Sequence, residues 1–237
     1  NYTLFLADNA LILGQRNAGW CGHGPVLEQD IAITNISLDL IGQARSLYQY
    51  AAELTGNGAT EDSLAYLRTE REFKNVLLTE QPNGDWAHTI LRQFFFSTYQ
   101  YYLYQVLINH PDSRLAAIAE KSLKEVTYHV RWSSEWVIRL GDGTEESHQR
   151  LKRAVDDLWC YTGELFVPAD YEEGIDLAGI KKSWEAKVKS ILEEATLSVP
   201  VNVFMHSGGK TGTHTEQLGF ILAELQFLQR TYPGAEW

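Results

Sequence analysis

Acidic residues and a histidine at helical spacing give the strongest chemical signal in this sequence of 237 residues. Glu70 is followed three residues later by Phe73, and Glu125 is followed by Tyr128 and then by His129. Di-iron carboxylate sites in helical bundles use a Glu-x-x-His pair from each of two helices and a further Glu from each of two others. The spacing therefore raises one specific chemistry, the binding and use of iron.

Two positions in this pattern lack the histidine that it requires. Phe73 cannot bind a metal ion, and Tyr128 stands at the other would-be His position. His129 is displaced by one residue, which places it about 100° further round a helix than Tyr128. We therefore predict that Phe73 and Tyr128 mark a ligand set that has decayed.

The other helices complete the set only in part. Asp39 is a further candidate acid, one methylene shorter than Glu, whereas the stretch between Asp85 and Asp112 contains no acidic residue. We expect no catalytic residue and no metal in this chain, and we expect these groups to hydrogen-bond one another inside a bundle. The vestigial pseudo-site consists of Asp39, Glu70, Glu125 and His129.

Two other classes of protein remain open at this point. One is a di-iron oxygenase or oxidase in its own right with an atypical ligand set, and it requires bound iron. The other is a ferritin-like storage or stress-binding protein, which the same missing ligands disfavour.

A glycine-rich loop is the second motif with chemical potential. Gly208-Gly209-Lys210-Thr211 is similar to the end of a phosphate-binding loop, but Phe204 stands where such a loop needs glycine. Two interpretations remain: a flexible surface loop, or a loop whose Lys210 contacts a partner or an anionic ligand such as CoA.

Composition excludes several classes of function. Lys and Arg number 20 against 31 Asp and Glu, so the formal net charge is −11. An acidic surface repels nucleic acid and anionic membranes. The cysteines, Cys21 and Cys160, are too few for a disulfide scaffold or a four-ligand zinc site. The sequence shows no membrane span or export signal, and we expect a cytoplasmic protein.

Apolar residues recur three and four apart almost throughout, which predicts an all-α fold. We expect Thr213 and Glu216 to form a capping box and Gly141-Asp142-Gly143 to end a long helix. No linker or repeat divides the chain, so we predict a single domain over residues 1–237. The predicted helices are Leu4–Ala18, Leu27–Leu54, Asp62–Leu78, Asp85–Asn109, Arg114–Leu140, Glu145–Phe166, Leu177–Leu197 and His214–Thr231.

The long helices carry two apolar stripes, which indicates that they are covered on two sides. In the segment Phe94–Tyr104, aromatic residues surround the helix axis. They form either an aromatic core with partly exposed tyrosines or a surface that meets another chain. The two faces of the Leu27–Leu54 helix hold Leu27, Ile31, Leu38, Ile41 and Tyr48 on one side, and Ile33, Ile36, Leu40, Leu47, Ala51 and Leu54 on the other.

Four motifs, spread in order over essentially the whole chain, resemble the PaaC family, the structural subunits of bacterial phenylacetyl-CoA epoxidase (ring 1,2-epoxidase). The motifs are Trp20-Cys21-Gly22-His23-Gly24-Pro25, Leu38-Asp39-Leu40-Ile41-Gly42-Gln43-Ala44-Arg45, Glu80-Gln81-Pro82-Asn83-Gly84, and the tail from Gly208 to His214-Thr215-Glu216-Gln217-Leu218-Gly219.

The resemblance implies a ferritin-like bundle of long helices with additional flanking helices. It also implies a non-catalytic, structural subunit of a cytoplasmic monooxygenase complex of aerobic phenylacetate breakdown. In that complex a catalytic paralogue holds the di-iron site, and a reductase with flavin and iron–sulfur groups supplies electrons from NADPH. The implied partners are the catalytic paralogue and the other epoxidase subunits, and self-association remains open.

Overall fold

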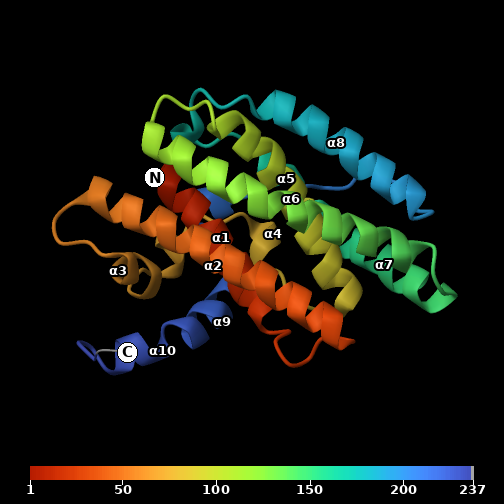
Figure 1. Ribbon diagram of the computed structural model, residues 1–237, viewed down its shortest axis with the longest axis horizontal. Helices are drawn as coiled ribbons and strands as arrows, with labels where there is room; N and C mark the ends of the chain where they lie inside the picture. Colours follow the sequence, from red (N-terminus) through yellow and green to blue (C-terminus); the bar gives the residue numbers. More distant parts are fainter. Residues whose placement is uncertain (236–237) are drawn as a thin grey trace. The chain divides into compact units, whose positions relative to one another are not determined.

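The computed structural model describes residues 1–235, which contain helices, turns and loops and no strand (Figure 1). The chain falls into two compact units, one formed by residues 1–82 with the C-terminal part from residue 208, the other by residues 83–207. The predicted all-α class is therefore confirmed for the described residues. The prediction of a single domain remains a prediction.

In the first unit, α1 (Tyr2–Ala18) packs along α2 (Leu27–Thr55). Residues 5–14 of α1 are all buried, because other elements of the unit, including α4 and α9, also contact this helix. α1 therefore forms the centre of this unit.

The predicted helix Asp62–Leu78 is wrong. The chain instead forms α3 (Glu61–Tyr66), a 3-10 turn η1 (Glu70–Glu72) and a short α4 (Leu77–Glu80). The backbone is extended at Phe73, and the Lys74 N–H donates to a carboxylate oxygen of Asp8 at 2.8 Å. A side chain of α1 thus takes the donor that a continuous helix would use internally.

The C-terminal part of the first unit contains η5 (Gly209–Thr211), α9 (Glu216–Leu225) and α10 (Phe227–Thr231). The N-cap of α9 is Thr215, whose side chain accepts from Gln217 N–H, so the predicted capping box at Thr213 is wrong. The predicted single helix also breaks at Gln226, whose side-chain amide donates to the carbonyls of Ala65 and Arg68.

In the second unit, α5 (Trp86–Leu107) packs against α6 (Ser113–Gly141), α7 (Glu145–Leu158) and α8 (Leu177–Glu194). Three 3-10 turns, η2 (Trp159–Tyr161), η3 (Gly163–Phe166) and η4 (Asp170–Glu172), connect α7 to α8. The predicted helix Glu145–Phe166 therefore ends as an α-helix at Leu158. The predicted end of a long helix at Gly141 is confirmed.

The aromatic segment of α5 is core. Phe94, Phe95, Phe96 and Tyr99 are buried, and the rings of Phe95, Trp159 and Trp184 lie 5.7–5.9 Å apart. Trp184 also donates from its indole N–H to the carbonyl of Phe95 at 2.8 Å. Along the rest of the segment, the tyrosines at 101 and 102 are half-buried, and Tyr104 is buried.

The two apolar faces of α2 differ in burial. Ile33, Ile36, Leu40 and Leu47 are buried. On the opposite face Leu27 and Leu38 are 72% and 61% exposed, and Ile31 and Ile41 are exposed as well. Tyr48 and Leu54 exchange places relative to the prediction, since Tyr48 is buried and Leu54 is exposed. We call Leu27, Ile31, Leu38 and Ile41 the α2 stripe.

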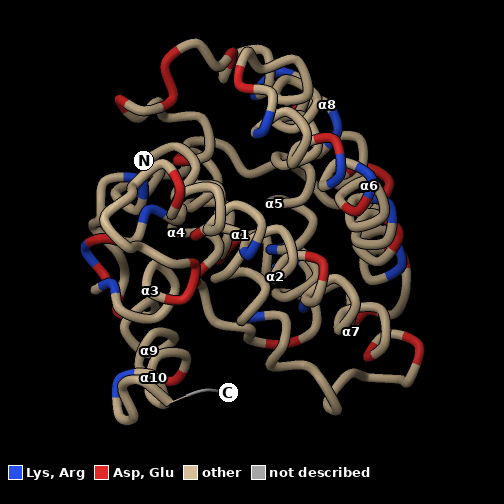
Figure 2. Tube along the Cα trace, turned by 60° about the vertical axis from the view of Figure 1, so that its left-hand side comes forward, with Lys and Arg blue, Asp and Glu red and all other residues tan. Residues whose placement is uncertain are grey.

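Exposed apolar side chains also occur outside the α2 stripe, among them Phe204, Phe220 and Phe227. Figure 2 shows acidic and basic residues interspersed along α6 and α8. In residues 1–235 no helix is long and apolar enough to cross a membrane.

Candidate functional site

The pseudo-site residues divide between the two units. Asp39 is half-buried on α2, and Glu70 is exposed in η1. Glu125 and His129 both lie on α6, where Glu125 is half-buried and His129 is fully buried. Among residues 1–235, no group of three or more His, Cys, Asp or Glu side chains is arranged to hold a metal ion. These residues do not fit a di-iron centre within either unit.

The spacing argument for Glu70 and Phe73 fails because these residues are not on one helix. Phe73 is buried, and its ring lies under the guanidinium of Arg68, with 4.2 Å from the carbon of that group to the ring centroid. This is a cation–π contact. Phe73 therefore packs a buried charge and does not stand one helical turn after Glu70.

On α6, Tyr128 is 38% exposed and its ring meets that of His129 edge to face. Between α5 and α6, the hydroxyl of Tyr104 hydrogen-bonds with Gln100 and Ser122. Burial raises the pKa of Tyr104, and the nearby Glu125 carboxylate raises it further. Polar groups thus join these two helices where the sequence suggested ligands. The expected hydrogen bonding of the pseudo-site residues to one another remains a prediction.

The principal buried charged cluster is one that the spacing of acids and histidines does not reveal. Asp8 on α1 is completely buried, and each of its carboxylate oxygens accepts two hydrogen bonds. Tyr48 donates from its hydroxyl at 2.6 Å, Arg68 donates through both terminal nitrogens, and Lys74 donates from its backbone N–H. A bidentate Arg–carboxylate pair of this kind is strong and geometrically specific.

The pKa shifts agree with this arrangement. Burial raises the pKa of Tyr48 well above its ordinary value, and the negative charge of Asp8 adds to the effect. Burial alone would lower the pKa of Arg68, but the contact with Asp8 outweighs it and raises that pKa. A guanidinium is therefore the cation that neutralises this internal carboxylate.

A second cluster joins two motifs that are far apart in the sequence. Residues 208–217, which we call the C-terminal strap, lie against residues 71–80 of the same unit. A side chain at Gly209 would collide with the carbonyl of Asn75, and one at Gly212 with the carbonyl of Arg71. Gly212 also has φ +86°, which favours glycine. The glycines thus allow backbone to meet backbone.

Glu80 is the centre of the second cluster. Its side chain is fully buried and accepts four hydrogen bonds. One oxygen receives the N–H and hydroxyl of Thr215 at 2.7 and 2.8 Å, and the other receives the amide of Asn75 and faces His214. The backbone carbonyl of Glu80 accepts two bonds from Arg16.

Lys210 is not on a surface loop. Its side chain is 4% exposed, and its Nζ lies 5.1 Å from the ring centroid of Phe5. The burial of Lys210 does not agree with the interpretation of this segment as a flexible surface loop. Contact of Lys210 with a partner or with CoA remains an untested prediction, and it requires this part of the strap to move.

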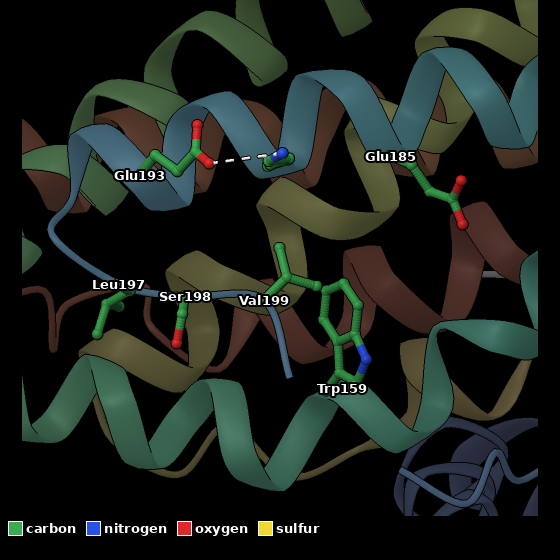
Figure 3. Close-up of a pocket in the computed structure, with 7 residues that line it drawn as sticks. Trp159, Glu185, Glu193, Leu197, Ser198 and Val199 are labelled. Carbon is green, nitrogen blue, oxygen red and sulfur yellow. Dashed lines mark ion pairs between the residues drawn. The ribbon is translucent and has the colours of Figure 1, made fainter. Parts of the chain in front are cut away.

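Two concave regions accompany these elements. In the first unit a groove of about 900 Å³ is lined by Glu70, Arg71, Glu216 and threonines of the strap. In the second unit a cleft of about 470 Å³ lies between Trp159, α8 and residues 197–199. Figure 3 shows Val199 beside Trp159, while Glu193 forms an ion pair with Lys189 at 3.7 Å. The groove also includes His214, but neither region contains the four carboxylates and two histidines of a di-iron carboxylate site.

Gly209→Ala tests the close approach of the strap. We expect a loss of about 1–3 kcal/mol in the free energy of unfolding, because the new Cβ meets backbone that cannot swing away. The matched control is Gly42→Ala in the interior of α2, where a Cβ meets nothing within 4 Å. That variant should gain about 0.5–1 kcal/mol from helix propensity. Urea unfolding measures both, and equal effects would contradict the packing described.

Comparison with known proteins agrees with the helical architecture. The family model described as "Phenylacetic acid catabolic protein" matches residues 1–237. The chain is 49% identical over 243 residues to a subunit of the 1,2-phenylacetyl-CoA epoxidase of Escherichia coli (strain K12), covering 100% of this chain and 98% of the relative. The ferritin-like fold class implied by the sequence motifs is confirmed by this family match. The chain therefore belongs to the phenylacetic acid catabolic protein family.

Proposed function

We propose that this chain is the non-catalytic, structural subunit of a phenylacetyl-CoA epoxidase complex in aerobic phenylacetate degradation. The observation that carries the proposal is the 49% identity, over the full length of the chain, to a subunit of the Escherichia coli epoxidase. The match covers 100% of this chain and 98% of the relative, so the similarity is not confined to one part of either protein.

Four features support a non-catalytic role. Glu70 lies on an exposed 3-10 turn, Phe73 packs on Arg68, and Tyr128 is partly exposed instead of pointing with His129 into the core. α5 carries no acid in its helical span. The catalytic iron belongs in this proposal to a paralogous partner, and this chain holds no cofactor of its own.

The α2 stripe is the surface that we assign to that partner. It presents four aliphatic side chains at helical spacing on a helix whose opposite face is already buried. Exposed apolar stretches of this kind mark protein–protein contacts. The further partners of the complex are the other epoxidase subunits and the NADPH-dependent reductase with its flavin and iron–sulfur groups, and the complex works in the cytoplasm.

Co-expression with the catalytic paralogue tests the proposal. The two chains should elute together on size exclusion, and epoxidation of phenylacetyl-CoA with the reductase and NADPH should need both. Separate elution, or undiminished epoxidation when this chain is omitted, would contradict the proposed role. Activity of this chain with the reductase alone would instead favour an independent oxygenase.

A further inference from the structure

The imidazole of His214 is held between two acceptors. Its Nδ1 lies 2.8 Å from a carboxylate oxygen of Glu80, and its Nε2 lies 3.0 Å from the backbone carbonyl of Phe73. The His214 side chain is 3% exposed and that of Glu80 is fully buried. A carbonyl oxygen only accepts hydrogen bonds, so Nε2 must carry a proton.

The hydrogen bonds of Glu80 show whether the other ring nitrogen of His214, Nδ1, also carries a proton. Three donors other than His214 point at this carboxyl group: the amide of Asn75 and the N–H and hydroxyl of Thr215. The amide of Asn75 and the backbone N–H of Thr215 can only donate, so each oxygen of Glu80 already acts as an acceptor. The proton between Glu80 and His214 therefore lies on Nδ1, which donates to the carboxylate. Both ring nitrogens of His214 are donors.

We propose that His214 is a doubly protonated imidazolium at neutral pH, and that its ion pair with Glu80 is a pH-sensitive latch holding the C-terminal strap and α9 against the rest of the first unit. The proposal concerns the fold of this chain and is independent of its role in an epoxidase.

Other charged groups around the latch come from several elements of the first unit. Arg16 donates to the backbone of Glu80 and to the side chain of Gln217, which ties α1 to both sides of the latch. These groups are Arg16 on α1, Glu70 and Arg71 in η1, Lys210 on the strap, and Glu216 and Glu224 on α9.

The direction of the pH dependence follows from proton linkage. Below about pH 6.5, an exposed histidine is also protonated, so docked and released straps bind the same number of protons. Above that pH, release of the strap frees one proton from His214. The equilibrium constant for opening should then rise by about tenfold per pH unit, until the docked imidazolium itself titrates.

Hydrogen exchange of the Thr215 amide reads the latch directly, because this N–H donates to Glu80. In the full chain, between pH 6 and 9 and after correction for intrinsic exchange, we expect its opening constant to rise with pH. In His214→Gln the opening constant should be larger and independent of pH, since glutamine has no proton to lose. His148→Gln, which alters a half-buried histidine of the second unit, is the matched control and should retain the wild-type profile.

Nitrogen-15 NMR of the histidine side chains at pH 7.5 provides the second measurement, made on the unaltered chain. The proposal predicts two ring N–H protons on His214, in slow exchange with water. A single ring N–H, or a Thr215 opening constant that does not change with pH in the wild type, would overturn the latch.

Discussion

Asp8→Ala should lower the free energy of unfolding by about 3–5 kcal/mol, the range for removing one partner of a buried ion pair. The substitution leaves the guanidinium of Arg68 inside the first unit without its counter-ion. It also removes the acceptor for the hydroxyl of Tyr48 and for the backbone N–H of Lys74. The loss should therefore exceed that of an ordinary large-to-small change.

Urea unfolding measures this effect, and Arg45→Ala is the control. The Arg45–Glu61 pair is also in direct contact, with an N–O distance of 2.9 Å, but the Arg45 side chain is 69% exposed. Exposed pairs contribute about 0–1 kcal/mol. In addition, Asp8→Leu combined with Arg68→Met should recover part of the loss, because no unpaired charge remains. A loss at Asp8 no greater than that at Arg45 would show that the cluster is not closed to water.

Charging the α2 stripe should abolish assembly with the catalytic paralogue. Ile31→Glu with Leu38→Glu places two carboxylates where the proposal has apolar contact, and an unpaired charge is costly to bury. We expect the affinity to fall at least about 100-fold, equivalent to about 2.7 kcal/mol. Because both side chains are exposed in the isolated chain, its own unfolding should change by less than about 0.5 kcal/mol.

The control for this pair is Gln49→Glu, which adds a carboxylate to an exposed position of α2 beyond the apolar stretch. Titration of the purified partner against each variant, by calorimetry, gives the affinities. If the double variant binds as tightly as wild type, the partner covers another face. If the control loses as much as the double variant, net charge and not the stripe governs assembly.

The periodicity of apolar residues predicts the long helices because the same residues that form the pattern are those that each helix buries in the core. α2, α5, α6 and α8 begin within one residue of their expected positions. Their apolar residues meet a core on the face that the spacing indicates, as the buried Ile33, Ile36 and Leu40 illustrate. The surplus apolar face of α2 is also visible in the sequence. Its exposure in the isolated chain is what a pattern alone cannot decide.

The failures share one physical reason, which is tertiary competition for local hydrogen-bond donors. Between residues 62 and 78 the apolar spacing favours a helix. Asp8, which lies 60 positions before Arg68 and 66 before Lys74, binds the Arg68 side chain and the Lys74 N–H and breaks that helix. The sequence pattern places Glu70 and Phe73 on that helix, and the interpretation of Phe73 as a would-be ligand position fails with it. A residue three positions after Glu70 has no fixed relation to it once the helix ends.

The strap could not be foreseen from the sequence for a similar reason. Glu80 and His214 are separated by 134 positions, and neither belongs to a recognisable catalytic motif. The glycines of this loop are a real signal, but those at 209 and 212 allow backbone contact with residues 71–77 and do not serve phosphate binding. Glycines in such a loop can therefore indicate close backbone packing as well as ligand binding.

The central claim, that this chain is a subunit without an iron centre, is tested most directly by its iron content. The measurement is elemental analysis of the full chain, purified alone, reconstituted anaerobically with Fe(II) and desalted. The account predicts iron near zero per chain, because Glu70, Glu125 and His129 do not form a ligand set within either unit. Iron near two per chain, lost when these three residues are replaced by alanine, would contradict it.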